Sequence, residues 1–233
     1  TDVQIFKKDN FIGINIKVYY PSVDTEGEIA YGIHGDGMIL VTNSLDLEKS
    51  KLPNLPKFGM SMALPKRFDN FTWFGRGPHE SYSDRKSSAK IDLYTGKVSD
   101  QYHPYIRPQE NGNKTDVRWA TFRDQYGYGL MLSGYLSLKA SHYTVIDYDT
   151  GVLIEDSGAL KLHKENRHTI DMVEKNLVQL DIDHLQMGVG GEDSWGAQPM
   201  EEYQLKPRKY IYHFSMQLIE PSDEPSNIYK NSF

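Results

Sequence analysis

The sequence predicts an all-β fold, a large antiparallel sandwich formed by a single domain. Two long segments, Phe11–Tyr20 and Tyr210–Leu218, alternate with period two, as strands with one buried face do. Between them lie shorter runs rich in β-branched and aromatic residues, separated by Gly, Pro, Asn or Asp. No helical stripe extends beyond a turn or two, so a sandwich is the simplest architecture for these elements.

Each predicted element follows from the local pattern. The first strand, Phe11–Tyr20, is expected to bury one face, formed by Ile12, Ile14, Ile16, Val18 and Tyr20. The shorter strands are expected at Glu28–Ile33, Met38–Thr42, Phe58–Leu64, Phe71–Phe74, Val117–Phe122, Gly129–Leu132, His168–Val173 and Leu177–Ile182. Asp46–Pro56 is interpreted as a loop that connects two strands, and Tyr143–Tyr148 could form one short helix. The sandwich is assigned to residues 1–220, with a polar tail at 221–233.

Composition narrows the classes of function. The 233 residues suffice for a full core, and the absence of cysteine excludes disulfides, thiolate metal sites and a cysteine nucleophile. The 26 basic and 32 acidic residues are interspersed, which argues against a nucleic-acid partner, and no apolar run suggests a membrane partner. The start at Thr1, without Met or a signal-peptide layout, suggests a chain excised from a longer one. The compartment stays open.

The richest polar segment, Trp73–Arg85, follows a predicted strand. Gly75 and Gly77, before Pro78, allow a bend that clusters charged side chains. Arg76, His79 and Glu80 are candidates to support a site loop. The whole cluster could instead clamp a polyol or act as acid and base: Arg76, His79, Glu80, Tyr82, Asp84 and Arg85. The alternative, which we favour for such a cluster alone, is an ion-pair and hydrogen-bond network that fixes a long loop.

A second segment, His103–Asn113, is stiffened by two prolines and predicts either a site wall or a packed crossover. Arg107, Glu110 and Asn111 are its candidates for site support. Glu110 could be a catalytic carboxylate, but it stands beside the turn signal Asn111-Gly112, and a structural role is the preferred interpretation.

A third segment, Gln186–Gly196, carries several glycines and ends in Trp195. An exposed indole packs against the C–H face of a sugar, whereas the alternative is a lid folded over the chain's own core. Glu192 and Asp193 are adjacent in sequence and rarely could face each other across a glycosidic bond, so we interpret them as acceptors that order the loop.

No metal site is expected. Only two histidines, His163 and His168, lie close together, and a spacing of five suits no common zinc pattern. A serine-hydrolase elbow, a phosphate-binding loop and a dinucleotide fingerprint are also absent from the sequence.

Taken together, the three segments resemble the last domain of the glycoside hydrolase family 2 β-galactosidases. The likeness rests on the order and spacing of WFGRGPHESY at 73–82, YIRPQENG at 105–112 and MGVGGEDSW at 187–195. Leu55–Met60 and Asp84-Arg85 fit the same pattern. The resemblance extends from about Phe11 to Leu218 and implies a galactose-mutarotase-like supersandwich.

The resemblance also implies where the chemistry takes place. In that family the catalytic glutamates belong to a central barrel that this chain lacks, and magnesium and sodium are expected in the parent's other domains, with no cofactor or catalytic residue here. Trp195 matches the tryptophan that stacks on the entering galactoside, and Glu192 replaces an aspartate usual in that loop. Family members carry a further stretch upstream, so the first strands of the sandwich are expected to be missing. The partners implied are the rest of the polypeptide and, for the parent, copies of itself.

Two other functions are compatible with the sequence. A stand-alone aldose epimerase would need a histidine and a carboxylate facing one sugar, and His79 with Glu110 would be the candidates. A carbohydrate-binding module would use Trp195, with Trp73 or Tyr105, as stacking platforms.

Overall fold

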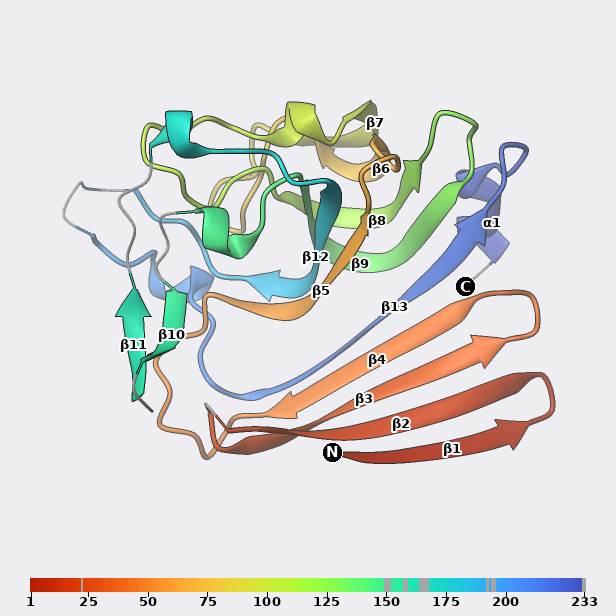
Figure 1. Ribbon diagram of the computed structural model, residues 1–233, viewed down its shortest axis with the longest axis horizontal. Helices are drawn as coiled ribbons and strands as arrows, with labels where there is room; N and C mark the ends of the chain where they lie inside the picture. The colour runs from red at the N-terminus through yellow and green to blue at the C-terminus, as the bar shows by residue number, and fades with distance from the viewer. Residues whose placement is uncertain are drawn as a thin grey trace.

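The structure, a computed structural model, is all-β and antiparallel, which confirms the predicted fold class (Figure 1). It describes residues 1–21, 23–148, 152–156, 159–163, 168–191, 193 and 196–231. The strands are β1 (Asp2–Lys8), β2 (Phe11–Tyr20), β3 (Thr25–His34), β4 (Ile39–Asp46), β5 (Lys57–Pro65), β6 (Asn70–Gly77), β7 (Lys90–Lys97), β8 (Lys114–Arg123), β9 (Gly129–Ser141), β10 (Val152–Asp156), β11 (Ala159–His163), β12 (Leu177–Gln186) and β13 (Lys209–Ile219). Four short 3₁₀ turns are described at Ser99–Gln101, Val145–Asp147, Thr169–Asp171 and Glu201–Tyr203, and one helix, α1, at Pro225–Asn231. None of the described helices is long and apolar enough to cross a membrane.

The described strands other than β10 and β11 form one continuous sheet that branches at β9. Its main path runs β1-β2-β3-β4-β13-β9-β8-β6-β7, while β12 joins β9 to β5. One edge of β9 pairs with β13 through Gly134 and then with β12 from Ser137 onward. A Cβ on Gly134 would lie 3.3 Å from the Cβ of Phe214, so glycine allows the close approach where β9 changes partner.

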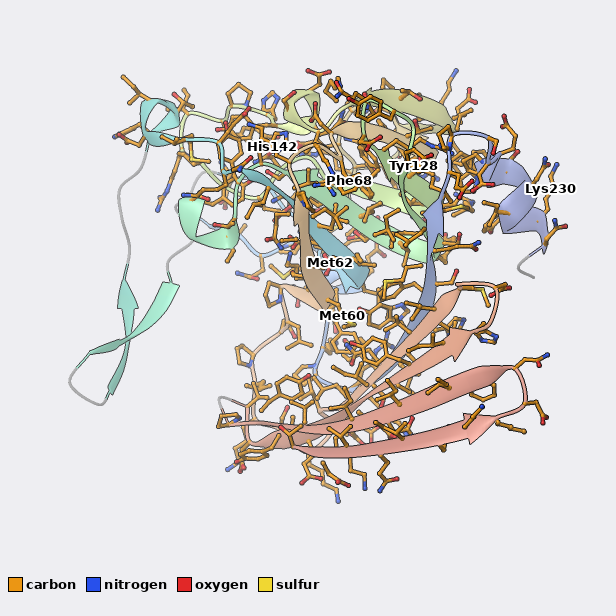
Figure 2. All side chains as sticks on the ribbon, turned by 45° about the vertical axis from the view of Figure 1, so that its right-hand side comes forward. Met60, Met62, Phe68, Tyr128, His142 and Lys230 are labelled. Atoms are coloured by element: carbon orange, nitrogen blue, oxygen red, sulfur yellow. The ribbon has the colours of Figure 1, made fainter. Side chains whose placement is uncertain are left out.

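The core fills the space between the ribbon β1–β4 with β13 and the strands β5, β12, β9, β8 and β6 (Figure 1). Phe71 stacks on Trp73 and on Phe122, with ring centroids 4.5 and 4.8 Å apart. Met60 and Met62 of β5 pack against this core and lie between the two layers in Figure 2. Burial of these apolar side chains supplies the main driving force for the fold.

The strands β1–β3 extend the apolar face of the core outward, but no described element covers all of their apolar side chains. Ile14 of β2 stands opposite Ile5 of β1 and Tyr31 of β3, so the three share one face. Exposure rises toward the edge, from 1% at Val41 of β4 to 70% at Ile5. The predicted bounds of β2 are confirmed. The face that was expected to be buried is only partly covered, because Ile14, Ile16, Val18 and Tyr20 are half-buried and Ile12 is 42% exposed.

One other prediction is wrong, and the tail contains an element that was not predicted. His168–Val173 forms a 3₁₀ turn instead of a strand, and Ile170 is 88% exposed because the segment pairs with no described strand. The tail, expected only to be polar, forms α1, whose Ile228 and Tyr229 pack near Trp119.

Candidate functional site

The candidate site lies where the three polar segments of the sequence meet. Arg76, on β6, donates from Nε to Asp116 Oδ2 at 2.5 Å and from Nη1 to Ala89 O at 2.8 Å. Burial raises the pKa of Asp116, but hydrogen bonds from Arg76 and Tyr135 outweigh it and hold that pKa below its usual value. Arg76 therefore ties β6 to the bulged start of β8.

Glu80 joins the first segment to the second. Its Oε1 accepts hydrogen bonds from Arg85 Nη2 and Tyr105 Oη, both at 2.5 Å, and its Oε2 accepts one from Gly112 N at 2.7 Å. Only 13% of the side chain is exposed. Three donors on one carboxylate fix the loop 103–112 against the turn after β6. His79, one residue earlier, is exposed, and its Nε2 lies 3.0 Å from Ser88 Oγ.

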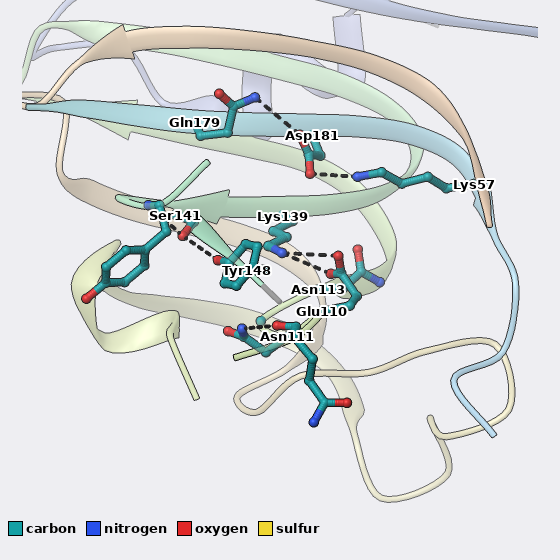
Figure 3. A network of polar contacts seen from close by, with 12 residues as sticks. Lys57, Glu110, Asn111, Asn113, Lys139, Ser141, Tyr148, Gln179 and Asp181 are labelled. Atoms are coloured by element: carbon teal, nitrogen blue, oxygen red, sulfur yellow. Dashed lines mark hydrogen bonds and ion pairs between the residues drawn. The ribbon is translucent and has the colours of Figure 1, made fainter. Parts of the chain in front are cut away.

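Glu110 and Asn111 face inward from the second segment (Figure 3). Both carboxylate oxygens of Glu110 lie 3.1 Å from Lys139 Nζ, and Tyr82 Oη donates to Glu110 Oε1 at 3.5 Å. Burial and the carboxylate of Glu110 raise the pKa of Tyr82 far above its ordinary value, so Tyr82 stays a donor. Asn111, 2% exposed, accepts from the backbone of the same loop and donates to it. The side chain of Arg107 is exposed.

A partly buried charged cluster adjoins Glu110 on β5, β9 and β12. Lys57 Nζ lies 2.7 Å from Asp181 Oδ2 and 3.7 Å from Asp183 Oδ2, while Lys139 Nζ lies over the Tyr148 ring at 4.4 Å from its centroid. The sequence interpretation missed these residues. Period-two alternation on β12 was the available signal, because it places Asp181 and Asp183 on the face opposite Leu180 and Ile182.

The third segment is attached to the first through Asp84, which was grouped with Arg76 and Glu80 from the sequence but was not linked there to the third segment. Asp84 Oδ1 accepts from Val189 N at 3.1 Å, and Oδ2 accepts from Gly190 N at 2.8 Å. Asp193, exposed, accepts from Ala197 N at 3.2 Å within the same loop. Glu192 and Trp195 lie outside the described residues.

The structure thus brings the three sequence segments together through two carboxylates of the first, Glu80 and Asp84. His79 and Glu110, the candidates for epimerase chemistry, engage different partners. Within the described ranges, no group of three or more His, Asp or Glu side chains is arranged to hold a metal ion.

The three polar segments lie within the region that is similar to known proteins. The family model described as beta galactosidase small chain matches residues 2–218. The β-galactosidase of Priestia megaterium is 33% identical over 210 residues, which cover 89% of this chain and 19% of that protein. The β-galactosidase of Streptococcus thermophilus is 31% identical over 222 residues, which cover 95% of this chain and 20% of that protein.

Among solved structures, a galactose mutarotase related enzyme from Lactobacillus acidophilus aligns with a TM-score of 0.39 and 11% identity, covering 96% of this chain and 73% of that one. A putative aldose 1-epimerase from Escherichia coli K12 aligns with a TM-score of 0.41 and 9% identity, covering 94% and 69%. At these values the likeness carries no argument about function. The chain spans about a fifth of the length of the curated relatives it matches. From the match over residues 2–218, the chain belongs to the beta-galactosidase small-chain family.

Proposed function

We propose that this chain is the non-catalytic C-terminal part of a β-galactosidase that hydrolyses terminal β-D-galactosides of the lactose type. In this proposal the rest of the polypeptide supplies the catalytic barrel, with its magnesium and sodium ions, and the parent assembles as a homo-oligomer. The chain contributes Trp195, whose indole stacks on the galactoside as it enters. The observation that carries the proposal is the family match over residues 2–218, which includes all three polar segments.

The hydrogen-bond and ion-pair partners of Glu80 and Glu110 support a non-catalytic role for this chain. Glu80 accepts from three donors, and Glu110 is paired with Lys139, so both serve to hold loops. A retaining glycosidase needs two carboxyl groups roughly 5–5.5 Å apart, one of them protonated before reaction and neither committed to structural partners. We infer that the acid and the nucleophile lie outside this chain.

The epimerase and the binding module remain as alternatives to be excluded by experiment. An epimerase would need His79 and Glu110 to face one sugar, but His79 contacts Ser88 while Glu110 is held by Lys139. Polarimetry on freshly dissolved galactose should show no acceleration by the purified chain. Calorimetry with galactose or lactose should show at most millimolar binding, because one aromatic wall is a small share of a sugar site.

The decisive experiment compares the purified chain with the full-length polypeptide on a chromogenic β-galactoside. We expect turnover by the full-length protein and none by the chain. Turnover by the purified chain at a rate that tracks its concentration would contradict the non-catalytic role. Circular dichroism of the chain must show a folded β-sheet in the same buffer, so that inactivity does not reflect unfolding.

A further inference from the structure

The loop that follows β12 is held through four consecutive backbone N–H groups. Backbone carbonyls of other segments accept the first two, those of Met187 and Gly188, at 2.9 and 2.8 Å. The next two, of Val189 and Gly190, donate to the two carboxylate oxygens of Asp84 at 3.1 and 2.8 Å. A single side chain, distant in sequence, therefore holds the backbone just before residues 191–196.

The loop is shaped to receive this carboxylate. Gly190 and Gly191 have φ values of +65° and +97°, which glycine adopts without strain. A Cβ on Gly188 would lie 2.5 Å from Asp84 Oδ2, closer than real Cβ contacts, so the carboxylate occupies the space that a side chain at 188 would need. Adjacent N–H groups directed at one anion form a strong, charge-assisted contact.

Asp84 itself stands on a rigid support. It lies in a tight turn closed by two backbone hydrogen bonds between Tyr82 and Arg85, at 3.0 and 3.1 Å. Tyr82 is fully buried at 0% exposure, and Arg85 is fixed by Glu80. The backbone turn that carries Asp84 is therefore fixed by the core, which limits the positions that its carboxylate can take.

We propose that Asp84 is a positioning residue: its carboxylate fixes the backbone at Val189 and Gly190, at the start of the segment that leads to Trp195, and so supports the stacking proposed for that tryptophan. This rests on the function proposed above, in which Trp195 stacks on substrate. Without the carboxylate the N–H groups of Val189 and Gly190 turn to solvent, so the backbone that leads to Trp195 is no longer fixed at these two residues, and ordering it on binding costs affinity. Because the indole contacts substrate and transition state alike, the loss falls on KM and not on kcat.

Kinetics of the full-length polypeptide with a nitrophenyl galactoside test the proposal. Asp84→Asn should raise KM by about fivefold or more with kcat within about twofold, and should add no further rise in a Trp195→Ala background. Gly188→Ala, whose methyl group displaces the carboxylate while Asp84 remains, should give the same result. Asp92→Asn is the matched control, because that carboxylate is exposed on β7 and, among the residues that the structure describes, accepts a hydrogen bond from its neighbour Leu93 N alone.

Amide hydrogen exchange in the purified chain supplies a readout independent of activity. Asp84→Asn should speed exchange at Val189 and Gly190 by about tenfold or more, while Asp92→Asn leaves it unchanged. Three results would each overturn the proposal. Asp84→Asn could leave the exchange rate of both amides unchanged, it could keep the wild-type KM while Trp195→Ala raises KM, or the effects of the two substitutions on KM could add in the double variant. If Trp195→Ala itself leaves KM unchanged, the proposed function fails, and the exchange rates still show whether Asp84 holds the loop.

Discussion

Asp183 should make the stability of this domain depend on pH around neutrality. Its side chain on β12 is only 4% exposed, and Lys57 Nζ, 3.7 Å away, pairs more closely with Asp181. Burial raises the pKa of Asp183 to about 7, and the charge of Lys57 only partly offsets burial and the neighbouring carboxylates Asp181 and Glu110. The folded protein thus holds a proton on Asp183 that the unfolded chain releases.

The size and sign of the effect follow from the two pKa values. The gap between the ordinary value of 3.8 and about 7 corresponds to roughly 4 kcal/mol. A raised pKa in the folded state means that the stabilisation is complete below pH 3.8 and is lost as pH rises toward 7. Between pH 5 and pH 8 the contribution of Asp183 to the free energy of unfolding should fall by roughly 3 kcal/mol.

Urea unfolding of the wild type and of Asp183→Asn at both pH values isolates this contribution. Asparagine is nearly isosteric and cannot ionise, so the difference in unfolding free energy between the two proteins should change by roughly 3 kcal/mol from pH 5 to pH 8. The same comparison with Asp92→Asn, exposed on β7, controls for general charge effects. A difference between wild type and Asp183→Asn that is equal at the two pH values would refute the reasoning.

Three further predictions concern the site and the core. In the full-length polypeptide, Trp195→Ala should raise KM for a nitrophenyl galactoside by about 5- to 150-fold, the equivalent of roughly 1–3 kcal/mol of lost stacking, and an unchanged KM would count against the assignment. Glu80→Gln removes the charge that three donors share and should lower the unfolding free energy by about 2 kcal/mol in urea titrations, an expectation that an unchanged midpoint would contradict. Leu138→Ala, at a fully buried position of β9, should cost about 2–5 kcal/mol in the same assay, and a cost below about 1 kcal/mol would show that the site is not packed as described.

Where alternation was regular, the sequence was sufficient to predict the strand. Phe11–Tyr20 matches β2 at both ends, because its period-two pattern is unbroken. The second half of β9 escaped prediction because Gly134 interrupts the pattern and because Ser137 and Lys139 place polar groups on a face that is nonetheless buried. Their partners, Asn113 and Glu110, come from a loop that no local pattern links to the strand.

For the site, sequence reasoning identified the segments but not their connections. Glu80 was selected from its neighbours, yet its partner Gly112 lies 32 residues away. Asp84 and Gly190 are separated by 106 residues, and no local sequence pattern in either segment predicts contact with the other. Such pairings arise only when β6, β8 and β12 assemble around one core, so they are properties of the tertiary fold and not of the motifs.

The branch at β9 has a consequence for the order in which the domain can be completed during synthesis. The meander β1–β4 can pair within itself early, since its strands follow one another along the chain. In the described sheet, however, β4 reaches the rest of the molecule only through β13, and β13 reaches β9 only after Lys209–Ile219 has left the ribosome. The apolar face of the early meander must therefore wait until residues 47–208 have been synthesised before β13 can pair with it, a delay that favours slow folding and the help of chaperones.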